Sequence, residues 1–192
     1  MPWTHPLVPA VILLAISLRA EARADYSAHR DSPIRTTDAR LAKLIHDGVR
    51  LSSTFQALVD RLTHSDLIVY VDADPYGPRG LDGRLTFVGA APGARYVRIR
   101  IAPYPDAARQ IAIIGHELRH AVEIADAPAV VDEESLGREY ARIGYSNRGW
   151  MPRVQSFETT AAIKTAQRVF RELTTGSEIS PRARLCRDHG VR

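Results

Sequence analysis

The sequence predicts an α+β fold in which a small sheet of three or more strands packs against a long apolar helix, with additional helices around it. Two observations lead to this prediction. Three short segments have the composition or the alternation of β-strands, and segments with the 3.6-residue periodicity of helices precede and follow them. Of the 192 residues 45% are apolar, which is enough to build one domain with a buried core.

The first helical segment begins after Thr37, a candidate N-cap, and extends to about Leu62. Apolar residues recur along it near helical spacing: Leu41, Leu44, Ile45, Val49, Leu51, Phe55, Leu58 and Leu62. Gly48 lies in the middle of this segment. Because glycine weakens a helix, we expect the segment to bend or split there.

The three strand segments comprise residues 67–72, 84–88 and 95–102. The first is a short apolar run that is rich in β-branched residues. The third alternates, so that its apolar residues lie on one face and Tyr96, Arg98 and Arg100 on the other. The connecting segments are dense in glycine and proline, as turns are. A small antiparallel or mixed sheet is therefore expected.

Three further helices are expected after the sheet. The second helix of the chain should cover about residues 105–125, and a short third helix residues 135–143. The fourth is amphipathic and should cover residues 157–173, with Ser156 as its N-cap and Gly176 at its end.

The N-terminal residues have the features of a signal peptide. Residues 7–18 form an apolar stretch that is too short to span a bilayer as a helix, and Ala22, Arg23 and Ala24 form an A-x-A cleavage signal. We predict a signal peptide over residues 1–24 and export to the periplasm or the extracellular space, with no stable membrane insertion afterwards. An uncleaved N-terminal anchor is the alternative, because no lysine or arginine precedes the apolar stretch.

The rest of the chain is expected to form one domain over residues 25–175, followed by a flexible basic tail over residues 176–192. Whether residues 25–60 act as a pro-segment is left open. The formal net charge of +4 is spread along the chain without a basic run, which argues against nucleic acid as a partner. The single cysteine, Cys186, excludes an internal disulfide.

The second helix contains the motif H-E-x-x-H, formed by His116, Glu117 and His120. At about 100° per residue, the two histidines lie only about 40° apart around the helix and one turn apart along it. Two imidazoles placed in this way can bind one metal ion from the same face. Glu117 lies beside that face, where its carboxylate can act as a general base towards water.

The motif, its apolar flanks and the helix–sheet–helix order resemble those of the zincin metallopeptidases, in a small exported form of bacterial type. The resemblance covers roughly residues 95–165. It implies a catalytic Zn²⁺, a peptide or protein substrate, His116 and His120 as metal ligands, and Glu117 as the general base. Arg119 departs from the family pattern, which usually has an uncharged residue at this position.

A catalytic zinc ion usually has three protein ligands, so a third is needed. The metzincin continuation of the motif is absent, because residues 123 and 126 are Glu and Asp. In gluzincins a glutamate on a later helix completes the site, and residues 158–162 (ETTAA) resemble that segment except for its last residue. The resemblance therefore points to Glu158, which we expect in the first turn of the fourth helix, where the helix dipole alone would also favour an acidic residue.

Glu139 on the short third helix is the main alternative as third ligand, and Glu133 and Glu134 come after it. Glu123 shares the face of His120, but it lies beyond the metal along the helix axis. We expect Glu123 to support the site or the fold by pairing with Arg119.

By the same resemblance, an extended peptide should bind along the strand at residues 95–102. Arg98 and Arg100 on this strand could favour acidic peptide segments. A solvated strand face is the simpler explanation of these two arginines.

The donor to a transition-state oxygen has three candidates, Tyr140, Tyr145 and Arg148, and the sequence does not select among them. Two alternative functions remain: a noncatalytic zincin-like protein that binds a metal or a partner, and a helical packing module without a metal.

Overall fold

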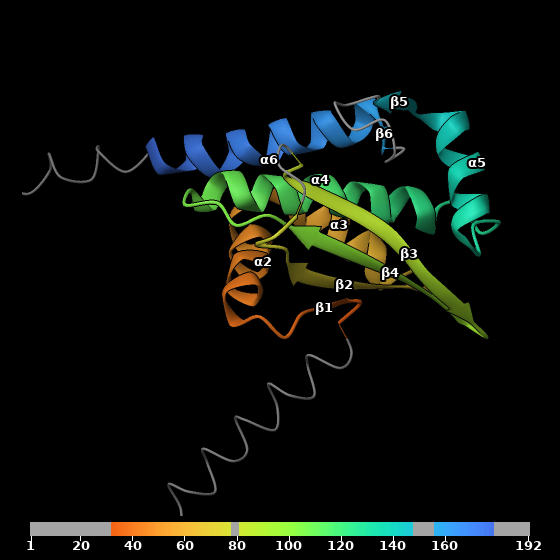
Figure 1. Cartoon of the computed structure of the whole chain (residues 1–192). Helices are drawn as coiled ribbons and strands as arrows, with labels where there is room; N and C mark the ends of the chain where they lie inside the picture. Colours follow the sequence, from red (N-terminus) through yellow and green to blue (C-terminus); the bar gives the residue numbers. More distant parts are fainter. Residues whose placement is uncertain (1–31, 78–80, 148–155, 179–192) are drawn as a thin grey trace, which may run out of the picture.

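The structure, a computed structural model, describes residues 32–77, 81–147 and 156–178. A four-stranded mixed sheet packs through one face against helices, and a further long helix lies on the far side of the central helix (Figure 1). The elements are β1 (Ile34–Arg35), α2 (Ala39–Leu51), α3 (Ser53–Thr63), β2 (Leu67–Ala73), β3 (Gly83–Ala91), β4 (Ala94–Ile101), α4 (Ala107–Ala125), α5 (Glu133–Ile143), β5 (Tyr145–Asn147), β6 (Ser156–Glu158) and α6 (Thr160–Glu178). The predicted α+β class is confirmed.

The strand order of the main sheet is β1-β2-β4-β3. Strands β1, β2 and β4 are parallel, and β3 pairs antiparallel with β4. The three predicted strands are present as β2, β3 and β4, and the alternation in β4 buries Val97, Ile99 and Ile101 against the helices. However, β4 is paired on both sides, so the expectation that it adds a peptide strand is wrong. Among the described strands, β3 is the edge strand next to β4.

The predicted first helix is split into α2 and α3, but the break is at Ser52 and not at Gly48. Ser52 has an extended backbone, and its hydroxyl accepts a hydrogen bond from the Phe55 amide at 3.0 Å, which starts the new helix. Gly48 instead provides room for packing: a Cβ at this position would lie 3.0 Å from the Phe55 ring. The N-cap of α2 is Asp38 and not Thr37.

Helices α2 and α3 are part of the core. Leu41 and Phe55 are fully buried, together with Leu62 at the end of α3. Because these side chains pack with those of the sheet and of α4, the removal of residues 39–63 as a pro-segment would open the core.

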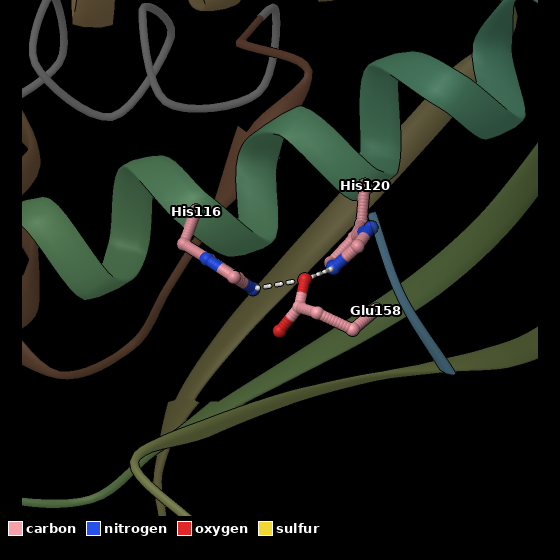
Figure 2. A group of neighbouring side chains, drawn as sticks. All are labelled: His116, His120 and Glu158. Atoms are coloured by element: carbon pink, nitrogen blue, oxygen red, sulfur yellow. Dashed lines mark ion pairs between the residues drawn. The ribbon is translucent and has the colours of Figure 1, made fainter. Parts of the chain in front are cut away.

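Helix α6 begins at Thr160, later than predicted. Residues 156–158 form the short strand β6, so Ser156 is not an N-cap and Glu158 is not in a helix; Figure 2 shows Glu158 beside α4. The cap is Thr159, whose hydroxyl accepts a hydrogen bond from the Ala162 amide at 3.1 Å. The helix continues to Glu178, so Gly176 does not end it.

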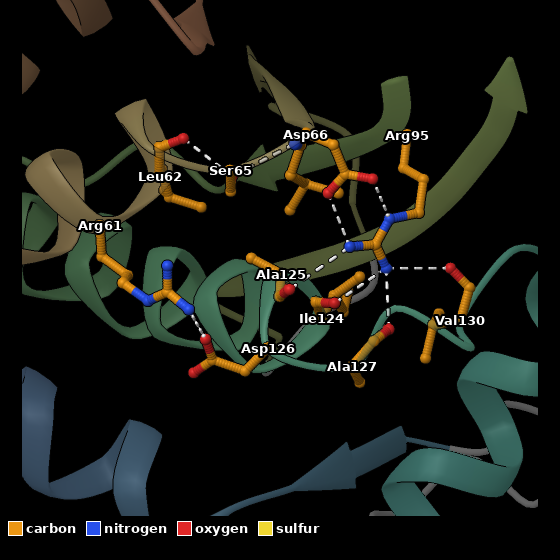
Figure 3. Close-up of polar contacts among 11 residues, drawn as sticks. Arg61, Leu62, Ser65, Asp66, Arg95, Ile124, Ala125, Asp126, Ala127 and Val130 are labelled. Atoms are coloured by element: carbon orange, nitrogen blue, oxygen red, sulfur yellow. Dashed lines mark hydrogen bonds and ion pairs between the residues drawn. The ribbon is translucent and has the colours of Figure 1, made fainter. Parts of the chain in front are cut away.

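Arg95 joins the sheet to the C-terminal end of α4 (Figure 3). The residue is 4% exposed, and its guanidinium donates to both carboxylate oxygens of Asp66 at 2.8 and 2.7 Å. It also donates to the carbonyl oxygens of Ile124, Ala127 and Val130 at 2.9, 2.8 and 3.1 Å. The carbonyl oxygens of Ile124 and Ala127 also accept from the backbone amides of Ala127 and Val130, so Arg95 adds a charged donor to a helix end that is already partly capped.

The described helices include none whose length and apolar character would suit it to crossing a membrane. The predicted signal peptide and Cys186 lie outside the described residues.

We expect Arg95→Ala to lower the free energy of unfolding by about 3 kcal/mol, because Asp66 and the carbonyl oxygens at the end of α4 lose a buried charged donor. The measurement is urea unfolding followed by circular dichroism. Arg61→Ala is the matched control: Arg61 pairs with Asp126 at the same end of α4, where the two side chains are 51% and 46% exposed, so its loss should cost less than about 1 kcal/mol. Equal losses in the two variants would contradict this role of Arg95.

Candidate metal centre

Helix α4 is buried over most of its surface. Asp106 caps its start by accepting hydrogen bonds from the amides of Ala108 and Arg109. The apolar residues that flank the H-E-x-x-H motif point into the core as predicted: Ile111, Ile114, Ala121, Val122 and Ile124 are 3% exposed or less, whereas Ile113 is only partly buried. The motif is therefore held on a rigid element.

The side chains of His116, His120 and Glu158 converge on one point (Figure 2). Nε2 of His116 lies 3.2 Å from Oε1 of Glu158, and Nε2 of His120 lies 3.4 Å from the same oxygen. One ligand atom from each residue lies within 4.8 Å of the other two, so the group can hold a metal ion. In the described part of the chain, this is the one group of histidine, cysteine or acidic residues with such a geometry.

A short hairpin brings Glu158 to the two histidines. Strands β5 and β6 pair so that Glu158 lies opposite Tyr145. Gly144, which precedes β5, allows this approach, because a Cβ at Gly144 would lie 2.6 Å from the carbonyl oxygen of Glu158. The Thr159 amide donates to Oε1 of Glu158 at 2.9 Å and orients the carboxylate. The structure thus brings together the three predicted ligands, with Glu158 at the end of a strand.

The alternative third ligands are not part of this group. Glu139 pairs with Arg142 on the same helix, α5. Glu134 pairs with Arg138 on the same helix, and Glu133 lies in its exposed first turn.

His120 and Glu158 are electrostatically coupled. Burial alone would lower the pKa of His120, but hydrogen bonds with Glu123 and Glu158 outweigh it and raise the pKa to about 9. Burial would raise the pKa of Glu158, whereas hydrogen bonds with His116 and His120 lower it well below its usual value. Without a metal, the two groups therefore form an ion pair at neutral pH.

Glu117 faces the same site from α4. It is 5% exposed, and burial raises the pKa of its carboxyl group above the usual value, while the nearby imidazoles lower it. Among the described residues, Glu117 has no hydrogen-bond partner. The start of β3 packs against this carboxylate: a Cβ on Gly83 would lie 2.7 Å from Oε1 of Glu117.

Glu123 contacts His120 directly. Its Oε2 atom lies 2.9 Å from Nδ1 of His120, and its Oε1 atom accepts a hydrogen bond from the Thr159 hydroxyl at 2.8 Å. The expected pairing with Arg119 is present, with Nε 3.5 Å from Oε1.

Two of the three candidate donors to a transition-state oxygen can be placed. Tyr140 is 6% exposed, and its hydroxyl donates to the carbonyl oxygen of His120 at 3.4 Å, so it supports α4 from α5. Burial raises the pKa of Tyr140, and the charge of Glu123 adds to this effect. Tyr145 is half exposed on β5, and Arg148 lies outside the described residues.

The sequence alone does not mark Gly83, Gly144 or Thr159 as residues of the site. Gly83 and Gly144 lie at element boundaries, where a glycine is ordinarily explained by a turn. The only available signal for Thr159 was its position next to Glu158.

Comparison of the chain with protein-family models, curated proteins and solved structures found no match.

Gly83→Ala should lower the free energy of unfolding by about 1–3 kcal/mol, because the added methyl group overlaps the buried Glu117 carboxylate and lies 3.0 Å from Cγ2 of Ile113. Gly89→Ala on the same strand is the control: no atom lies within 4 Å of its Cβ position, and we expect a change within about 0.5 kcal/mol. The cost of Gly83→Ala should be smaller in a Glu117→Ala background, because the overlapping carboxylate is then absent. An unchanged cost in that background would show that Glu117 is not the group displaced.

The stability of the metal-free protein should fall between pH 6.5 and about pH 9. The folded-state pKa of His120 is raised above its unfolded value of 6.5, so its contribution is complete below pH 6.5 and is lost as the pH approaches 9. Urea midpoints measured with a chelator at pH 6, 7.5 and 9 test this. His120→Gln should flatten the decline, whereas His46→Gln, at a side chain that is 76% exposed, should retain it.

Proposed function

We propose that this protein is a zinc-dependent peptidase in which His116, His120 and Glu158 bind the metal and Glu117 acts as the general base. The observation that carries the proposal is the convergence of two imidazole Nε2 atoms and one carboxylate oxygen beside a buried glutamate that has no described hydrogen-bond partner. Stability alone does not account for this arrangement, because it is costly to remove most of a carboxylate side chain from water.

The donor set fits zinc. Zinc is commonly bound by nitrogen and oxygen ligands at about 2.0–2.2 Å in a tetrahedron, which puts neighbouring ligand atoms about 3.4 Å apart. The separations of 3.2 and 3.4 Å between each Nε2 atom and the Glu158 oxygen agree with this value. Three protein ligands leave a fourth position open, as in catalytic sites. When bound, zinc would activate a water molecule and polarise a carbonyl group.

Glu117 supplies the proton transfers. Burial raises the pKa of its carboxyl group, which makes the carboxylate a stronger proton acceptor. Its carboxylate would accept a proton from the attacking water and then deliver it to the leaving nitrogen. Because Gly83 packs on one side of this carboxylate, the carboxylate is held in a defined orientation for both steps.

Strand β3 is the best candidate for binding the substrate. It is the edge strand of the sheet, and its first residue, Gly83, lies against Glu117. A peptide that adds to this edge in an extended conformation would pass the general base with its backbone hydrogen-bonded to β3. We therefore transfer the strand-addition hypothesis from β4 to β3.

The proposed enzyme acts outside the cytoplasm, on the strength of the apolar stretch and the A-x-A sequence that ends at Ala24. Its proposed partners are peptides or unfolded proteins. The alternative is a noncatalytic protein that uses the same three ligands to bind a metal. Glu117 is the residue that separates the two functions, since a purely structural metal site has no need of a base.

The purified protein should contain about one zinc ion per chain, and it should hydrolyse an unfolded protein. Glu117→Gln should retain zinc and lose activity by about 10²- to 10⁴-fold, because proton transfer is removed while the ligands remain. His116→Ala and Glu158→Ala should lose zinc as well as activity. The measurements are metal analysis by mass spectrometry and release of peptides from a reduced, alkylated protein.

Glu139→Gln is the matched control, because Glu139 pairs with Arg142 away from the site and should affect neither measurement. Stoichiometric zinc without any hydrolysis would favour the noncatalytic alternative. Absence of zinc from protein that was purified without chelators would overturn both.

A further inference from the structure

We propose that Glu123 and Thr159 together are positioning residues, which lock the His120 imidazole and the Glu158 carboxylate into one metal-binding arrangement. This inference rests on the proposed zinc site. Its basis is a closed chain of contacts that runs from His120 through Glu123 and Thr159 to Glu158 and back to His120.

The first link fixes the orientation of His120. A neutral imidazole carries one proton, and the nitrogen that bears it cannot bind a metal. Nδ1 lies 2.9 Å from a Glu123 carboxylate oxygen, which accepts but does not donate a hydrogen bond. When a metal ion takes the place of the proton on Nε2, the remaining proton is therefore held on Nδ1, and Nε2 is oriented towards Glu158 and the proposed metal position.

The second link uses the single hydroxyl proton of Thr159. The hydroxyl oxygen already accepts a hydrogen bond from the Ala162 amide, as the cap of α6. Its proton is donated to the other carboxylate oxygen of Glu123 at 2.8 Å. Because both directions of the hydroxyl are used, the rotamer of Thr159 is determined. Its backbone amide then donates to Glu158, so the orientation of this carboxylate follows from the same residue.

The hydrogen bond between Glu123 and Thr159 is buried and joins two segments that are distant in the sequence. Glu123 and Thr159 are 8% and 3% exposed and are separated by 36 residues, so Glu123 ties the segment that carries Glu158 to α4. On its other side, Arg119 places a positive charge 3.5 Å from Glu123. A carboxylate is a costly way to fill buried space, whereas it is well suited to accept from an imidazole and a hydroxyl at once.

The test is the zinc affinity of Glu123→Gln and Thr159→Val, measured by competition with a chromophoric chelator. Each should weaken binding by about 10- to 100-fold, because loss of the groups that orient metal ligands has this effect. Thr159→Ser keeps the hydroxyl and should bind zinc like the parent. The double variant should be weaker than either single variant by much less than the product of the two effects, since both substitutions break the same chain of contacts.

The absorption spectrum of the cobalt(II)-substituted protein is a readout that a merely structural role would not change. The visible bands of the parent should shift in Glu123→Gln and Thr159→Val and remain in Thr159→Ser. Glu139→Gln is again the control that leaves both readouts unchanged. If Glu123→Gln does not fold, as judged by circular dichroism, the comparison of Thr159→Val with Thr159→Ser decides alone.

Parent-like zinc affinity and cobalt spectra in folded Glu123→Gln and Thr159→Val would overturn this inference and leave the peptidase proposal intact. Conversely, a parent that binds zinc but hydrolyses no peptide would overturn the peptidase, while weakened binding in the two variants would still support the positioning role. A parent that binds no zinc would overturn both proposals.

Discussion

The close approach of α6 to α4 is the constraint on which the candidate site depends. Gly115 immediately precedes His116, and a Cβ at this position would lie 3.2 Å from Val169 of α6 and 3.5 Å from Phe55 of α3. Ala162, in the first turn of α6, is fully buried. The absence of a side chain at Gly115 lets α6 pack close to α4, and the segment just before α6 reaches the imidazole face of α4. A larger residue at Gly115 would press against Val169 of α6 and Phe55 of α3.

The packing of α6 against α4 also brings several charged side chains close together. Glu117, Glu123 and Glu158 lie with two imidazoles in one largely buried region, which without compensation would destabilise the fold. Part of the compensation is internal, since hydrogen bonds with Glu123 and Glu158 keep His120 protonated in the metal-free chain. A bound cation would replace that proton and stabilise the carboxylates directly. Arg119, 3.5 Å from Glu123, adds a further positive charge, so Glu117 is the acidic group of this region for which the described residues supply neither a hydrogen bond nor an ion pair.

The sequence predicts those structural features that depend on residues close together in the chain. Helix α4 and the three longer strands were found because their periodicity reflects burial on one face, and the two histidines were paired by helical geometry alone. Strands β1, β5 and β6 have only two or three residues and carry no such signal. The interior position of β4 was also missed, because strand order depends on pairing between distant segments. Glu158 was identified by residue type and spacing, although its place on a strand end was not.

Helix α4 is held against the sheet at both ends, and this determines which way its polar face points. At its start, Gln110 is 1% exposed, donates to the Ala102 carbonyl oxygen at 3.2 Å and accepts a hydrogen bond from Arg40. At its end, Arg95 binds the carbonyl oxygens of the last turn and the following loop. A helix fixed at two separated points can neither rotate about its axis nor slide along it. The histidines and Glu117 therefore keep a constant direction relative to Gly83 on β3, as both metal binding and proton transfer at a defined position would require.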